Sequence, residues 1–164
     1  MTIAHSGILL FDLLLIAAAL DDMKRLQVSN LLPLAIVGAF GVHLVLNGVT
    51  WHIWQNLAGF AAMLLVGGLL FARRVIGGGD AKLLAAGALW FDFHGLAIWL
   101  PAVAIIGGLT AIILFIVRGM LPVQAVAEGG WIALQRRGPI PYAVPICLAA
   151  IATAHLAGTS PSVG

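Results

Sequence analysis

Acidic residues are the side chains of this sequence best suited to chemistry, and the chain has only six of them. A carboxylate inside or at the edge of a membrane is costly, so each one in so apolar a chain needs a partner or a function. Asp21, Asp22 and Asp80 lie at the ends of apolar stretches. Two carboxyls a few ångströms apart cannot both ionise readily, and the pair then shares a proton. Such a pair can activate a water molecule against an amide carbonyl.

The other three acids have structural interpretations. Glu128 lies in a predicted loop, where a solvated charge is expected. Asp92 lies between aromatic residues and near His94, which is typical of an anchor at a membrane interface. Asp12 lies near the middle of an apolar stretch, where a protonated or hydrogen-bonded acid could bridge to another helix. A direct role for Asp12 remains open at this stage.

Three glycines, Gly77 to Gly79, lead into Asp80. Backbone without side chains is tolerated at membrane depth only where protein buries it or where it lines a wet cavity. The run lacks the spacing and the Lys-Ser/Thr ending of a phosphate-binding loop, and an Asp at a helix start would repel a phosphate. Taken alone, Asp80 fits a helix cap and a catalytic acid equally well.

No cofactor and no metal are expected. The single cysteine, Cys147, excludes an intramolecular disulfide and a CxxC zinc site. A water-activating pair of carboxyls needs neither a metal nor a covalent intermediate. The five histidines are scattered along the sequence, and most are expected to face outward: His5, His43, His52, His94 and His155.

The composition indicates the class of protein that must position these acids. Hydrophobic residues make up 62% of the 164 residues, charged residues only 9%, and the mean hydropathy is +1.12. Soluble domains carry about 25% charged residues. These values exclude an ordinary soluble domain, a disordered chain and a nucleic-acid-binding module with a basic face. We expect an all-α integral membrane protein with a single domain over residues 1–164, in contact with a lipid bilayer and no nucleic acid.

Intervals without charged residues predict six membrane spans, since a spanning helix needs about 20 apolar residues. The fourth predicted span is short, at about 22 Å against a bilayer core of about 30 Å. If it crosses, all eight Lys and Arg residues fall on one side, as the positive-inside rule favours. Both termini then lie outside. The predicted spans cover residues 3–20, two stretches between 26 and 72 with a turn at 47–50, 81–95, 93–117 and one within 138–164.

Other residues carry expectations about packing. Trp51, Trp54, Trp90 and Trp99 are predicted near the outer interface, where amphipathic rings concentrate. The loop 119–137 is apolar enough to form either an interfacial helix or a plain loop. Two glycine pairs, at 67–68 and 107–108, are predicted to be sites of close helix packing.

Two segments resemble the motifs of type IV prepilin peptidases. The run from Asp22 to Asn30 resembles the first motif, in which an Asp follows the first helix, basic residues come next and an Ile-Pro-Asn-like triplet opens the second helix. Here that triplet is Val-Ser-Asn, and counting back eight positions from Asn30 selects Asp22 over Asp21. The run from Gly77 to Ala86 resembles the second motif, GxGD followed by a Lys-Leu pair. The resemblance covers essentially the whole chain.

The resemblance implies a six-helix bundle of the GxGD aspartyl protease type, with Asp22 and Asp80 as the catalytic acids. Supporting roles fall to Gly77, Gly79, Lys82 and Asn30. The short chain is similar to the Flp/Tad-type form, which lacks the N-terminal zinc and methylation domain, so N-methyltransferase activity is not expected. Residues 139–142 (Pro-Ile-Pro-Tyr) also resemble an element of the short forms.

A protein of this family would cleave prepilin or pseudopilin precursors at the cytoplasmic face of the bacterial inner membrane. Lys82, Lys24 and Arg25 are expected mainly to anchor the cytoplasmic side, and a role in tuning the acids or in meeting an acidic group on the substrate stays open. Two other functions remain as alternatives: a small proton-coupled transporter in which Asp12, Asp22 and Asp80 form a relay, and a non-catalytic subunit of a pilus or secretion assembly.

Overall fold

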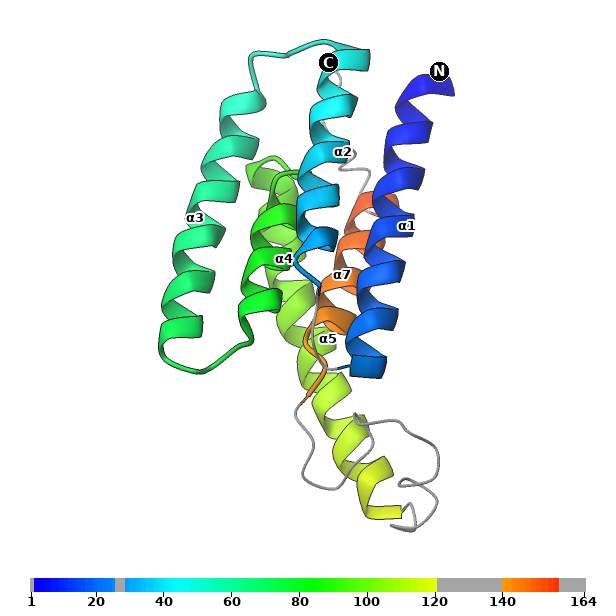
Figure 1. Ribbon diagram of the computed structural model, residues 1–164, viewed down its shortest axis with the longest axis vertical. Helices are drawn as coiled ribbons and strands as arrows, with labels where there is room; N and C mark the ends of the chain where they lie inside the picture. Colours follow the sequence, from blue (N-terminus) through cyan, green and yellow to red (C-terminus); the bar gives the residue numbers. More distant parts are fainter. Residues whose placement is uncertain (1, 26–28, 121–139, 157–164) are drawn as a thin grey trace.

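The computed structural model describes residues 2–25, 29–120 and 140–156. Within these ranges the chain forms six helices and no strand, which confirms the all-helical prediction (Figure 1). The helices are α1 (Thr2–Arg25), α2 (Leu31–Asn47), α3 (Ile53–Ala72), α4 (Gly78–Ala88), α5 (Phe93–Met120) and α7 (Ala143–Leu156).

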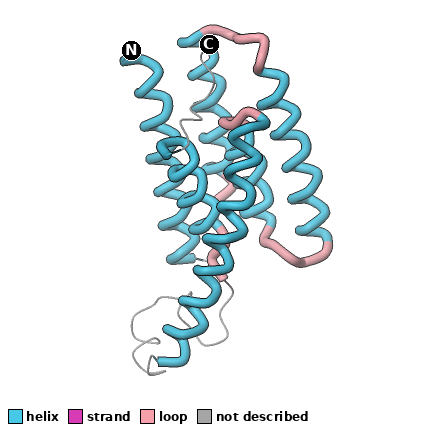
Figure 2. Tube along the Cα trace, turned by 180° about the vertical axis from the view of Figure 1, so that it is seen from behind, coloured by secondary structure: helices cyan, strands magenta, loops and turns pink. Residues whose placement is uncertain are grey.

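Successive helices run in alternate directions (Figures 1 and 2). Helices α1, α3 and α5 run one way, and α2, α4 and α7 return. The end of α1, the connection from α3 to α4 and the start of α7 therefore lie at one end of the bundle, which we call the cavity end. At 28 residues α5 is about 42 Å long, and its last turns extend beyond the other helices at this end.

The predicted turn between the second and third spans is confirmed. Helix α2 ends at Asn47, and α3 begins at Ile53. Gly48 has a φ of 86°, a left-handed conformation that glycine adopts without steric cost, and its N–H donates to the Leu44 carbonyl oxygen at 2.9 Å. The glycine thus ends α2 at the position that the sequence indicates.

The predicted fourth span, 81–95, is wrong at both ends. Helix α4 begins at Gly78 and ends at Ala88, 11 residues in all. The chain turns at 89–92, and α5 begins because Asp92 Oδ1 accepts the Gly95 N–H at 2.7 Å. This is a helix N-cap, so Asp92 starts a new helix rather than acting only as the expected interface anchor. Within the last predicted span, α7 covers only Ala143–Leu156.

Two of the four tryptophans predicted at the outer interface are instead packed inside the bundle. Trp90 and Trp99 are fully buried, and their indole N–H groups donate to the carbonyl oxygens of Ile36 and Ile146 at 3.2 and 3.3 Å. Phe11 stacks on Trp90 with 4.5 Å between ring centroids. Because each indole N–H has a hydrogen-bond acceptor inside the bundle, neither ring has to lie at the polar membrane interface. Trp51 and Trp54 are exposed.

The glycine pairs contribute unequally to helix packing. A Cβ atom on Gly67 would lie 3.2 Å from backbone and side-chain atoms of Ala81, so α3 and α4 approach closely there. A Cβ on Gly107 would make only ordinary contact with Pro145, at 3.8 Å. Gly68 and Gly108 have nothing within 4 Å at their Cβ positions. The close-packing prediction is confirmed for Gly67 and wrong for Gly68 and Gly108.

The outer surface of the described helices is rich in exposed leucine, isoleucine and valine. Helices α3 and α5 are long and apolar enough to cross a membrane, and α2 and α7 are shorter apolar helices. These features indicate a membrane-associated protein. The predicted loop or interfacial helix at 119–137 lies outside the described residues, apart from positions 119 and 120 at the end of α5, and Glu128 lies outside them too.

Candidate active site

Asp22 and Asp80 line one cavity of about 360 Å³ at the cavity end of the bundle. Asp22 comes from the last turn of α1, and Asp80 from the first turn of α4. The structure thus brings together the two acids that the sequence singles out. We call this space the two-Asp cavity; its wall is formed by Asp22, Phe71, Arg74, Val75, Ile76, Gly77, Asp80, Ile140 and Tyr142.

Asp22 is held by the beginning of α7. The side chain is only 4% exposed, and its Oδ2 atom accepts the backbone N–H of Ala143 at 3.0 Å. Ala143 is the first residue of α7, where backbone N–H groups lack partners inside the helix and favour a negative charge. Burial raises the pKa of Asp22, the Ala143 hydrogen bond lowers it, and the charge of Asp21 raises it. Asp22 lies beyond the predicted span 3–20.

Asp80 lies in the first turn of α4, and its carboxyl keeps its proton to a higher pH than an ordinary aspartate does. Burial raises its pKa to about 6, the charge of Asp22 adds to the rise, and a hydrogen bond to the Gly77 backbone opposes it. The effect of Asp22 on Asp80 means that the two carboxyls are electrostatically coupled. At a pH below about 6 the pair can therefore hold one proton and one negative charge.

Gly77 leaves the room that Asp80 occupies. It is the N-cap of α4, with φ −69° and ψ 151°, an extended conformation open to any residue. A Cβ atom at this position would lie 2.9 Å from Asp80 Oδ2. The glycine therefore leaves the carboxyl in a position from which a Cβ atom would displace it. Gly78 and Gly79 are already part of α4, so the helix begins two residues before Asp80 rather than after the whole glycine run.

The neighbouring acid, Asp21, serves the connection between α1 and α2. Its Oδ2 atom accepts the N–H of Ser29 at 3.3 Å, and Ser29 Oγ accepts the N–H of Leu31 at 3.4 Å. Asp21 is not part of the cavity wall, whereas Asp22 is. This geometry favours Asp22 as the acid that faces a substrate.

Lys82 and Asn30 tie the two motifs together. Lys82 Nζ, on α4, donates to Asn30 Oδ1 at 2.8 Å. Asn30 directly precedes α2, so the contact links the segment that follows α1 to the helix that carries Asp80. Lys82 was expected mainly as a cytoplasmic anchor; the structure adds a specific partner. The bond is exposed, so it adds little to the free energy of unfolding. Its main effect is to hold α4 in line with the segment before α2.

Several residues in or beside the cavity wall were not among the residues singled out from the sequence. Ala143 binds Asp22 through its backbone, so its side chain gives no signal, and Phe71 and Arg74 belong to an end of α3 that carries no motif. Their closeness to the glycine run was the only available hint. Ile140 and Tyr142 belong to the Pro-Ile-Pro-Tyr stretch that resembles an element of the short forms.

Asp12 lies apart from this cavity. Its Oδ2 atom is 2.7 Å from His155 Nε2, a contact between α1 and α7 that confirms the predicted bridge to another helix. Ten residues separate Asp12 from Asp22, which is about 15 Å along a helix. Of the four histidine side chains that the structure describes, His52, His94 and His155 are exposed, as expected for most of them. His43 is the exception: it is buried and shares a hydrogen bond with Asn47 at 3.2 Å.

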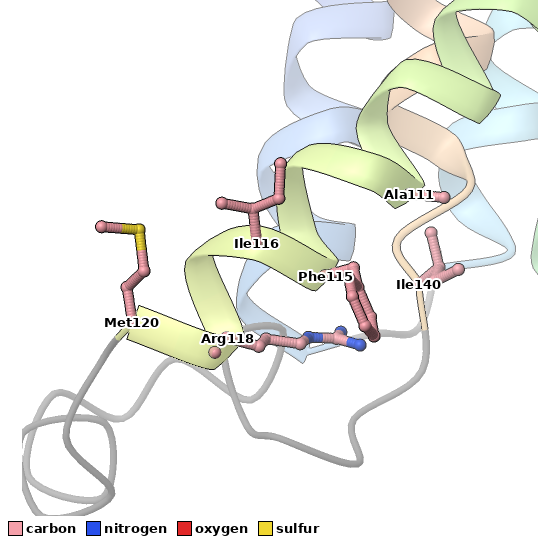
Figure 3. Close-up of a pocket in the computed structure, with 7 residues that line it drawn as sticks. Ala111, Phe115, Ile116, Arg118, Met120 and Ile140 are labelled. Carbon is pink, nitrogen blue, oxygen red and sulfur yellow. The ribbon is translucent and has the colours of Figure 1, made fainter.

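A second hollow, of about 480 Å³, borders the end of α5 (Figure 3). Figure 3 shows Phe115 and Arg118 on the side of α5 nearer Ile140, a residue that also belongs to the two-Asp cavity. No carboxyl occurs among the described residues that line this hollow. Although larger, it lacks the groups for acid–base chemistry, so the two-Asp cavity is the candidate active site. Its described lining is Ala111, Phe115, Ile116, Arg118, Gly119, Met120 and Ile140.

Fold and site together define a class: membrane-associated helical proteins with two coupled carboxyls in a cavity at one end of the bundle. Comparison with known families makes this specific. The model of the type IV leader peptidase family matches residues 9–116, a stretch that contains both Asp22 and Asp80. The chain belongs to this family, and the family indicates a protease. Searches of curated proteins and of solved structures give no match.

Proposed function

We propose that this protein is a membrane-embedded aspartic endopeptidase that removes the short leader from prepilin or pseudopilin precursors. One observation carries the proposal: two acids from distant parts of the family match, Asp22 and Asp80, share a single cavity. Among the described residues of that wall, Asp22 and Asp80 are the only carboxyls, no histidine or cysteine occurs, and Tyr142 contributes a phenol. The two carboxyls are the pair suited to activate water.

The two carboxyls have different partners, which assigns their roles. Asp22 accepts the Ala143 N–H, a hydrogen bond that favours its ionised form, so Asp22 is the base. Asp80 keeps its proton to about pH 6, so Asp80 is the acid. Asp22 takes a proton from water as the water oxygen bonds to the scissile carbonyl carbon, and Asp80 gives its proton to the carbonyl oxygen.

The tetrahedral intermediate then breaks down by reversing these transfers. Asp22 passes the proton taken from water to the amide nitrogen, and the carbon–nitrogen bond breaks. As the carbonyl re-forms, the hydroxyl proton returns to Asp80. Each carboxyl ends the cycle in its starting state, so neither a metal nor a covalent intermediate is required.

Charge supports a cytoplasmic position for the two-Asp cavity. Basic residues on α1, α4, α5 and the end of α3 lie toward the cavity end: Lys24, Arg73, Arg74, Lys82 and Arg118. In a bacterial inner membrane, basic residues concentrate on the cytoplasmic side. We therefore propose six spans with both termini periplasmic. The leader of a precursor would reach the acids from the cytoplasm, while its following apolar segment stays in the bilayer.

The transporter alternative needs Asp12 in a relay with Asp22 and Asp80. The described structure instead pairs Asp12 with His155, about 15 Å along α1 from Asp22. Asp12 is therefore separated from the two cavity acids and is not placed to pass protons to them, as such a relay requires.

Cleavage by purified protein tests the proposal. Full-length protein in detergent or lipid nanodiscs is mixed with a synthetic precursor that has a basic leader and an apolar segment, and products are identified by mass spectrometry. We expect Asp22→Asn and Asp80→Asn each to lower kcat by at least about 100-fold, because each removes an acid–base group. Asp21→Asn, the matched control, should stay within about threefold of the natural chain. Processing that survives both cavity changes would contradict the proposal.

A further inference from the structure

Arg74 has a backbone conformation that side-chain-bearing residues rarely adopt. Its φ is 59°, and it is the one non-glycine residue with positive φ in the described part of the chain. It follows α3 in a Schellman motif: the Arg74 N–H donates to the Phe71 carbonyl and the Val75 N–H to the Leu70 carbonyl, both at 2.9 Å. Glycine is the favoured residue at this position, so an arginine here carries a conformational cost.

The same residue forms part of the wall of the two-Asp cavity. Arg74 is exposed, and it is the only basic residue among the described residues of that wall. Within the described chain it forms no ion pair with Asp22 or Asp80. A cation that stands in the cavity wall without neutralising the acids is available to a ligand that enters the cavity.

Its neighbour provides an internal comparison. Arg73 has the same charge, follows the same helix and is exposed, but its φ of −84° is ordinary and it does not line the cavity. If position 74 served only to add positive charge at this end of the bundle, glycine would end α3 at lower cost and Arg73 would remain. The side chain of Arg74 therefore has a use that its position in the cavity wall indicates.

We propose that Arg74 binds a carboxylate on the substrate chain close to the scissile bond and so sets specificity for precursors with an acidic residue there. This inference rests on the proposed function. Guanidinium is planar, always charged and able to bind a carboxylate through two parallel hydrogen bonds. Two acids in the cavity would otherwise repel an acidic substrate residue, and Arg74 offsets that repulsion.

The substitution Arg74→Gly removes the side chain and keeps the backbone conformation, because glycine adopts a positive φ freely. We compare Arg74→Gly, Arg74→Lys and the control Arg73→Gly on two synthetic precursors, one with Glu near the cut and one with Gln in its place. For the Glu precursor we expect Arg74→Gly to raise KM roughly tenfold with little change in kcat. Arg74→Lys should recover part of the loss. For the Gln precursor we expect the natural chain and the Arg74 variants to have similar KM values. Arg73→Gly should have the KM of the natural chain on both precursors. Thermal unfolding of Arg74→Gly should occur at the same or a higher temperature.

The outcomes separate this inference from the proposed function. If the natural chain cleaves and Arg74→Gly cleaves both precursors equally well, Arg74 has no specificity role, while the peptidase proposal stands. An equal loss with both precursors would overturn the carboxylate assignment. If the natural chain cleaves neither, the peptidase proposal fails, and equilibrium binding of the same Glu and Gln peptides to the natural chain and to Arg74→Gly decides the inference alone. Weaker binding of only the Glu peptide would support it, and unchanged binding would overturn it.

Discussion

Asp80 combines a position at the start of a helix with a raised pKa, two features that oppose one another. The N-terminus of a helix favours a carboxylate, whereas burial and the charge of Asp22 favour the protonated acid. Burial is the largest of these effects, and the pKa rises to about 6. A backbone hydrogen bond favours the charged form of each acid, from Ala143 for Asp22 and from Gly77 for Asp80, and the charge of Asp22 raises the pKa of Asp80. The asymmetry between two chemically identical side chains thus comes from their partners.

The pH dependence of cleavage follows from this asymmetry. The reaction needs Asp80 protonated, so kcat/KM should fall as the pH rises through about 6. It also needs Asp22 ionised, so kcat/KM should fall on the acidic side as Asp22 takes up a proton. A bell-shaped profile is expected from initial rates over a range of pH values. In Asp21→Asn the acidic limb should move to lower pH, because the charge of Asp21 raises the pKa of Asp22. A rate that keeps rising above pH 7 would contradict these roles.

Gly77→Ala tests the space that the Asp80 carboxyl occupies. The new Cβ would lie 2.9 Å from Asp80 Oδ2, so the carboxyl must move, while the backbone conformation suits alanine. We expect kcat to fall by about tenfold or more with little change in the unfolding temperature. Gly38→Ala is the control, because its Cβ position in α2 has nothing within 4 Å. Equal activity of the two variants would show that the carboxyl tolerates the displacement.

At the residue scale, the sequence predicts side-chain chemistry better than backbone chemistry. Asp22 and Asp80 could be singled out because a carboxyl in an apolar chain is costly, and both lie in the cavity wall. The N–H of Ala143 could not be predicted, since every residue except proline carries one and only the fold brings it to Asp22. Arg74 was counted among the basic residues, but its φ follows from the way α3 ends.

At the scale of elements, the approach of α3 to α4 decides where Asp80 lies. Ala81, next to Asp80 on α4, packs on Gly67 of α3. A Cβ atom on Gly67 would lie only 3.2 Å from atoms of Ala81. On the other side of α4, Lys82 binds Asn30. Consecutive residues of α4 therefore contact the cavity, α3 and the segment before α2. The first turn of α4 is fixed from three directions, which aligns the acid with Asp22.

Gly67→Ala tests this contact, and Gly68→Ala is its matched control one residue along α3. At position 67 the added methyl must push α3 and α4 apart, which should cost about 1–3 kcal/mol of unfolding free energy and lower kcat by displacing Asp80. At position 68 nothing lies within 4 Å, so the unfolding free energy should change by less than about 1 kcal/mol. Denaturant unfolding in detergent and cleavage rates measure both effects. Equal behaviour of the two variants would rule out a special role for the Gly67 contact.

Element boundaries were predictable where a local signal exists and not where tertiary contacts decide. The Asn47-Gly48 step predicts the end of α2, because glycine is free to adopt the left-handed conformation found there. The end of α4 at Ala88 was missed because the apolar run continues past it, and Trp90 was assigned to an interface although a carbonyl of α2 accepts its N–H. A run of hydrophobic residues does not record whether lipid or protein covers it.

On the scale of the whole molecule, α7 completes a site that begins with α1. The two helices meet at Asp22 with Ala143 and again at Asp12 with His155. The family match ends at residue 116, before α7, so the N–H that supports the proposed base comes from outside the matched stretch. A protein cut after α5 would leave Asp22 without this partner. The carboxyl-terminal helix is thus part of the candidate site even though it carries none of its acids.

Opposite ends of the bundle should face opposite sides of the membrane, and two valines make a matched test of this topology. Val49 lies in the connection from α2 to α3 and Val75 in the connection from α3 to α4, at opposite ends of α3, and they are 71% and 56% exposed. The natural chain is the unlabelled reference, because Cys147 is only 1% exposed. In right-side-out vesicles a membrane-impermeant maleimide should label Val49→Cys and spare Val75→Cys, and in inverted vesicles the pattern should reverse.

The labelling pattern also bears on the access of substrate to the two-Asp cavity. Val75 is part of the cavity wall, so labelling of Val75→Cys only from the cytoplasmic side would support cleavage of a leader that remains in the cytoplasm. A precursor peptide added before the maleimide should slow that labelling and leave Val49→Cys unchanged. Labelling of both positions from the same side would contradict a membrane-spanning α3. Labelling of Val75→Cys only from outside would place the cavity on the wrong face for the proposed reaction.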